Sequence, residues 1–111
     1  MAKNTSQNPA FIYDNVVQNP KVVNPSTSIT VDEDTNIVIC GANSLAITLA
    51  ATSNSPVYIT SIDGTTQRTG CTIVVGSQDF VIADGGCAAY CVRYGAPSAN
   101  QWMVIGAKTA S

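Results

Sequence analysis

Short apolar runs with a period of two residues follow one another along most of the chain. Between Leu45 and Leu49, leucine and isoleucine alternate with alanine and threonine, which is typical of a β-strand with one buried face. Turn-forming pairs such as Asp63-Gly64 separate these runs. About eight short strands at this spacing predict an all-β fold, either a sandwich or jelly-roll-like domain, a barrel, or a triple-stranded β-helical (solenoid) module. The predicted strands are 28–31, 36–40, 45–49, 57–62, 71–75, 80–83, 88–94 and 102–105.

Several of these strands are apolar on both faces. Trp102 and Val104 share one face of their strand, yet Met103 and Ile105 on the other face are apolar as well. A strand of this kind is covered on both sides, which favours a neighbouring subunit on the second face. The alternative is a central position in a two-sheet packing that loops shield from solvent. Only 11% of the residues are charged, against roughly a quarter in ordinary soluble domains, and this low charge also favours self-association.

The first 27 residues differ from the rest of the chain. Asn-Pro pairs at 8–9, 19–20 and 24–25 force extended backbone and disfavour helix. We therefore predict an extended N-terminal arm over residues 1–27, followed by a β-domain over residues 28–111. The arm would place its apolar clusters in grooves on another chain, and the alternative is that it supplies an ordinary first strand of the same domain. The partner-binding residues expected in the arm are Phe11, Ile12, Tyr13, Val16, Val17, Val22 and Val23.

Charge and hydropathy exclude several classes of partner. The net charge is −2 and the five cations are scattered, so the sequence offers no basic patch for nucleic acid. No run approaches the roughly 18 apolar residues that a membrane helix needs. The N-terminus lacks the cationic start and apolar core of a secretory signal. We expect a soluble chain made in the cytoplasm, with neither a nucleic acid nor a membrane as its partner.

The search for catalytic, cofactor and metal sites finds no candidate. The chain has no histidine, the usual acid and base near neutral pH, and most of its carboxylates occupy turns. The acidic segment 31–36 lacks the ligand spacing of a calcium loop and is interpreted as a solvated hairpin turn. We expect no enzymatic activity, no cofactor and no metal. The four cysteines are interpreted as small buried hydrophobic residues: Cys40, Cys71, Cys87 and Cys91.

Four aromatic residues in or beside the predicted strands have two interpretations. Tyr58, Tyr90, Tyr94 and Trp102 could stack on sugars or bases. At strand spacing such residues are more often packed side chains whose polar tip reaches an interface. We therefore take three of them as candidates for a subunit interface: Tyr90, Tyr94 and Trp102.

The segment from Thr30 to Gly106, about 70% of the chain, resembles the small β-modules of tailed-bacteriophage virion proteins. The resemblance lies in the series SITVDEDTNIVIC, SLAITLAAT, VYITSIDGTT, CTIVVG, FVIADGG and QWMVIG, whose closing strand begins with tryptophan. Modules of this kind are commonly trimeric and all-β. They serve as decoration (cement) proteins on the capsid exterior or as parts of tail fibres, head fibres and spikes. The resemblance carries over no catalytic residue.

The leading hypothesis is a trimeric capsid decoration protein that stabilises the phage head by bridging coat subunits. Its partners would be further copies of itself and the major capsid protein, and its location the capsid exterior after synthesis in the host cytoplasm. The alternative is a short tail-fibre or head-fibre protein that binds host surface glycans. A carbohydrate-binding or small hydrolytic β-domain forms a third class, which would require a pocket with convergent carboxylates.

Overall fold

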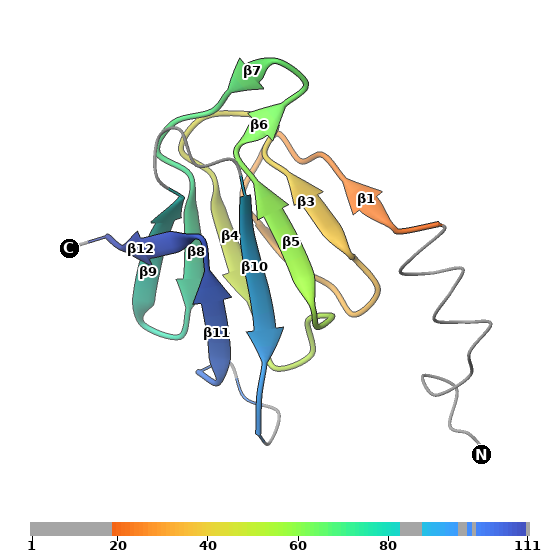
Figure 1. Cartoon of the computed structure of the whole chain (residues 1–111), viewed down its shortest axis with the longest axis vertical. Coiled ribbons are helices and arrows are strands. Elements are labelled where there is room, and N and C mark those ends of the chain that lie inside the picture. The colour runs from red at the N-terminus through yellow and green to blue at the C-terminus, as the bar shows by residue number, and fades with distance from the viewer. Residues whose placement is uncertain (1–18, 83–87, 96–97, 99, 111) are drawn as a thin grey trace.

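Two five-stranded β-sheets face each other across an apolar core. The computed structural model describes residues 19–82, 88–95, 98 and 100–110, and these form twelve strands and no helix. A short two-stranded sheet accompanies the two larger ones (Figure 1). The prediction of an all-β fold is therefore confirmed, and the sandwich among its alternatives describes the domain. None of the described residues belongs to a helix with the length and apolar character needed to span a membrane.

We refer to the two large sheets as sheet A and sheet B. Sheet A contains, in spatial order, β1 (Val22–Val23), β3 (Ile37–Ile39), β5 (Val57–Thr60), β10 (Ala88–Arg93) and β11 (Trp102–Ile105). Sheet B contains β12 (Ala107–Thr109), β9 (Gln78–Ile82), β8 (Thr72–Val75), β4 (Ala46–Leu49) and β2 (Ile29–Thr30). The small sheet is the hairpin of β6 (Ile62–Asp63) and β7 (Thr66–Gln67).

The first half of the chain winds between the two sheets. Strands β1, β3 and β5 form parallel pairs in sheet A, and the strands between them, β2 and β4, form a parallel pair in sheet B, which β8 extends. Each turn of this winding adds one strand to each sheet, with 15 to 26 residues between paired positions. The last four strands pair antiparallel and complete both sheets on the same side, so that each sheet has five strands (Figure 1).

The core lies between the sheets and is built from alternate residues of each strand. In the middle strand of sheet B, Ile73 and Val75 are buried, whereas Thr72 and Val74 point to the outer face. The same alternation buries Val57 and Ile59 in the middle strand of sheet A. One continuous apolar cluster joins both sheets, as expected when a period-two pattern directs every second side chain inward. Other members of the cluster include Val31, Val38, Leu45, Ile47, Leu49, Ile82 and Ala89.

Each of the eight predicted runs contains a strand, and the structure adds elements that the pattern did not predict. Residues Val22–Val23 form β1, so the alternative interpretation of the N-terminal segment, a first strand of the domain, describes these two residues. The run 57–62 does not form one strand, because the chain leaves sheet A after Thr60 and begins the small hairpin at Ile62. The C-terminal strand β12 is also additional. It pairs with β9 at the edge of sheet B.

A single glycine connects the last strand of sheet A to the last strand of sheet B. Gly106 has a φ of +95°, and a Cβ placed on it would lie 2.5 Å from the carbonyl oxygen of Ala88. The corner therefore passes directly over the start of β10, and only a residue without a side chain fits there.

Candidate functional site

The outer face of sheet A is uncharged across all five strands. Register and alternating burial identify its outward side chains, and within the described residues none of them is an acid, a lysine or an arginine. Four large side chains on this face are about half exposed, with exposed fractions of 47% to 53%. Thr60 is the only outward residue here that is neither apolar nor aromatic. The outward residues are Val22, Ile37, Ile39, Tyr58, Thr60, Ala88, Tyr90, Val92, Met103 and Ile105.

A row of side chains crosses this face at right angles to the strands. Its five members are paired in register from one edge of the sheet to the other. The two central tyrosines have ring centroids 4.9 Å apart at a tilt of 48°, a favourable arrangement for an aromatic pair. The row consists of Val22, Ile37, Tyr58, Tyr90 and Ile105.

The outer face of sheet B differs in composition. Threonine hydroxyls, one carboxylate and one ammonium group lie among its outward side chains, and Val74 and Val81 are only partly exposed. Water hydrates such a face well, because its hydroxyl and charged groups form hydrogen bonds with the solvent. The two faces of the sandwich therefore differ in what they can bind. The outward residues of sheet B are Thr30, Ala46, Thr48, Thr72, Val74, Asp79, Val81 and Lys108.

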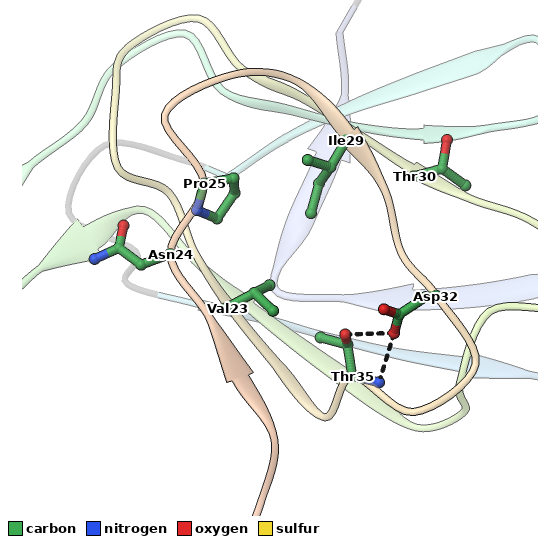
Figure 2. Close-up of a pocket in the computed structure, with 7 residues that line it drawn as sticks. All are labelled: Val23, Asn24, Pro25, Ile29, Thr30, Asp32 and Thr35. Carbon is green, nitrogen blue, oxygen red and sulfur yellow. Dashed lines mark hydrogen bonds between the residues drawn. The ribbon is translucent and has the colours of Figure 1, made fainter.

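A pocket of about 450 Å³ opens at the end of the sandwich where the winding begins. Figure 2 shows Val23 from β1 and Ile29 from β2 pointing toward the same hollow, with Pro25 beside them. The polar side of the pocket consists of Asn24, Thr30, Asp32 and Thr35. Asp32 is the only carboxylate among these seven lining residues, so the pocket does not present the pair of carboxylates that a glycosidase would need.

The Asp32 carboxylate stabilises the turn that connects β2 to β3. Its Oδ1 accepts hydrogen bonds from the Thr35 hydroxyl (2.5 Å) and from the backbone amides of Thr35 (2.9 Å) and Asp34 (3.2 Å), as Figure 2 shows for Thr35. These hydrogen bonds, above all the one from the Thr35 hydroxyl, lower the pKa of Asp32. The expectation of a hairpin turn at 31–36 is wrong, because β2 and β3 belong to different sheets. The hydrogen bonds of Asp32 instead stabilise the corner at which the chain passes from sheet B to sheet A.

Lys21 lies beside this acidic turn. Its Nζ is 2.7 Å from Asp34 and 3.3 Å from Asp32, and these carboxylates raise the pKa of Lys21. The three side chains are largely exposed, so the ion pairs contribute little to stability. In the part of the chain that the structure describes, no three acidic, cysteine or histidine side chains are grouped closely enough to hold a metal ion.

Three cysteines occupy the core as free thiols. Cys40, Cys71 and Cys91 are buried, which confirms their interpretation as small hydrophobic residues. Burial raises the pKa of Cys40 and of Cys91 to about 12, so neither is ionised near neutral pH. Cys87 lies outside the described residues.

The predicted partner-binding residues are found in different surroundings. Phe11, Ile12, Tyr13, Val16 and Val17 lie outside the described residues. Val22 is on the outer face of sheet A, whereas Val23 points inward and packs against the core.

The three interface candidates also separate. Tyr90 lies on the outer face of sheet A, and Tyr94 follows β10 with 55% of its surface exposed. Trp102 does not lie on the surface, since it is buried inside the domain under the Arg93 guanidinium, whose central carbon is 5.5 Å from the ring centroid. Arg93 is held there by a hydrogen bond that it donates to the Ser53 carbonyl oxygen.

The outward residues of β3 and β5 were not among the predicted interface residues. Ile37 and Tyr58 join the same face as Tyr90 only because the parallel winding places β3 beside β5. The sequence signal that did point to this face was the second apolar face of 102–105, and Met103 and Ile105 are indeed exposed on it.

Comparisons with protein-family models, with curated proteins and with solved structures found no match.

Proposed function

We propose that this chain is a structural virion protein, a homotrimeric capsid decoration protein that stabilises a phage head by bridging coat subunits. The observation that carries the proposal is the uncharged outer face of sheet A, which contrasts with the hydroxyl and charged groups on the outer face of sheet B. A chain with this surface is suited to assembly with other protein surfaces. The resemblance of residues 30–106 to phage virion modules supplies the particular setting.

The proposed mechanism is thermodynamic. A protein that binds only the assembled shell stabilises the shell by mass action. The part of the N-terminal arm that precedes β1 would provide a second anchor, because its sequence carries apolar clusters and β1 lies at the edge of sheet A. Two anchors on one molecule raise the effective concentration of each at the capsid surface.

The number of copies per virion tests this proposal directly. Quantitative protein analysis of purified virions should give a copy number comparable to that of the major capsid protein. A handful of copies would contradict decoration and point to a vertex or a tail. Complete absence would contradict every virion function.

The arm is tested by replacing Phe11, Ile12 and Tyr13 with serine in the full chain. Attachment to capsids should be lost, whereas thermal unfolding of the β-domain should be unchanged. Retained attachment would show that these residues are not the anchor.

The second candidate is a short tail-fibre or head-fibre protein that binds host surface glycans. Exposed aromatic rings favour it, because Tyr94 and the Tyr58–Tyr90 pair could stack on sugar rings. Sugar recognition also needs several well-placed polar groups, and sheet A offers only the tyrosine hydroxyls and Thr60 on its outer face. Decoration is therefore the better proposal. Binding of purified protein to a glycan array would reverse this order.

A further inference from the structure

The strongest unexplained feature of the molecule is the difference between its two outer faces. Sheet B presents hydroxyls together with Asp79 and Lys108, whereas sheet A presents no charged group at its described outward positions. The chain has seven acidic and five basic residues, and those described lie at turns, at edges or on other surfaces. A difference of this kind marks a contact surface, because exposed apolar patches of a few hundred Å² on soluble proteins are usually functional.

The backbone of this face is rigid in the way that a contact surface requires. Tyr58 lies on the middle strand, with β3 paired on one side and β10 on the other. Its ring is held beside the Tyr90 ring, so neither aromatic side chain must be ordered from a fully mobile state when a partner binds. Preorganised aromatic side chains near the centre of a contact surface are typical of residues that dominate binding.

The chemistry of the face selects an uncharged partner. A charged group brought against it would lose water and find no opposite charge, which is costly. A partner with the same apolar character loses few hydrogen bonds to water when the two faces are buried together. The outer face of sheet A on a second copy of this chain is such a surface, and it is present at the same concentration wherever the chain is made.

We propose that the outer face of sheet A is the surface through which copies of this chain associate, the same face of each copy contributing to the contact. The proposal deepens the proposed function, and it rests on the self-association in that proposal but not on the virion. The contact is centred on the row from Val22 to Ile105, with Tyr58 and Tyr90 in its middle.

The size of the face sets the expected strength of association. Five strands about 4.8 Å apart, with a mean length of about four residues, give a flat area of about 24 by 13 Å, or about 300 Å² per copy. This is well under half of the roughly 800 Å² per partner in a standard interface. We therefore expect association that depends on protein concentration in the micromolar to millimolar range and becomes complete where copies are held close together.

The test is analytical ultracentrifugation of the full chain over this concentration range, with two matched lysine variants. Tyr58→Lys places a charge at the centre of sheet A, and Val74→Lys places one at the centre of sheet B. Both positions point outward from the middle strand of a five-stranded sheet. Tyr58→Lys should weaken association by about a hundredfold or more, the effect of losing a central contact residue. Val74→Lys should leave it unchanged.

Further measurements separate the outcomes. If Tyr58→Lys fails to fold by circular dichroism, Ile105→Lys on the edge strand β11 tests the same face at a position that is 53% exposed. A monomeric wild type at every concentration would overturn the proposal, as would equal weakening by Tyr58→Lys and Val74→Lys.

The serine variant at Phe11, Ile12 and Tyr13 distinguishes the face from the arm. If this variant loses association while Tyr58→Lys retains it, the contact belongs to the arm and the proposal is overturned. A dimer would support the face and contradict the trimer of the proposed function. A low copy number on virions would contradict the decoration function but not the association of copies through sheet A.

Discussion

The corner at Gly106 allows the fold to be tested by the addition of one methyl group. We predict that Gly106→Ala is strongly destabilising, because two costs coincide there. A left-handed φ costs an L-residue about 1 to 2 kcal/mol. The new Cβ would also lie 2.5 Å from the Ala88 carbonyl oxygen and 3.2 Å from the Ala89 Cα. Both atoms belong to the backbone of β10, which is paired on both sides and cannot move aside easily.

The net effect follows from adding these terms. Relieving the overlap by shifting backbone costs about 1 to 3 kcal/mol, by analogy with overpacked cores. The lower conformational freedom of alanine in the unfolded chain returns about 0.4 to 1 kcal/mol. The free energy of unfolding should therefore fall by about 1 to 4.5 kcal/mol, which corresponds to a decrease in Tm of about 5 to 30 °C for a domain of this size.

Gly64→Ala is the matched control for this measurement. Gly64 also has a left-handed φ, +65°, but a Cβ placed there meets nothing within 4 Å. Its substitution should cost only about 1 kcal/mol, because the strain of the backbone acts without a clash. Urea unfolding followed by circular dichroism compares the two variants. If Gly106→Ala costs no more than Gly64→Ala, the corner does not lie over β10 and the closing of the sandwich described above is incorrect.

Three further predictions concern the core, the acidic turn and the thiols. Ile47→Ala removes three carbons from a fully buried side chain and should lower the free energy of unfolding by about 3 to 4 kcal/mol, measured by urea unfolding, whereas a change below about 1 kcal/mol would mean that the face is not buried. Asp32 has a lowered pKa in the folded chain, so its contribution to stability is present above the unfolded pKa of about 3.9 and is lost as the pH falls below that value. Asp32→Asn should therefore lose less stability than the wild type between neutral pH and about pH 3, and an equal loss would contradict the role of the carboxylate. Cys40 and Cys91 should resist alkylation in the folded chain and react in urea, as peptide mass spectrometry would show, and rapid labelling of the folded chain would contradict their burial.

The strands themselves could be predicted because burial acts on the local pattern. Leu45, Ile47 and Leu49 are buried, and the period of two around them correctly placed β4. The pairing of the strands could not be predicted, since parallel and antiparallel neighbours impose the same alternation on a sequence. The hairpin after Thr60 was missed because apolar Ile62 lengthens the run of strand-forming residues, although it is out of phase with buried Val57 and Ile59 and the chain has already left the sheet.

The candidate surface could be predicted only in part. The second apolar face of 102–105 indicated a contact, and Tyr90, which was predicted as an interface residue, lies on the outer face of the same sheet. Tyr58 is 32 positions away from Tyr90, and only the register of β5 with β10 brings their rings together. Trp102 was predicted at an interface, because an aromatic residue at the start of an edge strand can point to either face of the sheet. In the structure its ring is buried, and the Arg93 guanidinium lies over it.

The winding of the first strands also has a consequence for the order in which the chain folds. Parallel pairs such as Ala46 with Thr72 join distant positions, and their loops must close before any contact compensates the lost entropy. The β8–β9 hairpin, in contrast, joins Val75 to Gln78 and forms on a microsecond timescale. We expect this hairpin to form first and to serve as the template on which β4 and then β2 are added. Because β8 and β9 are synthesised after β2 and β4, the N-terminal strands leave the ribosome before the surface that orders them exists.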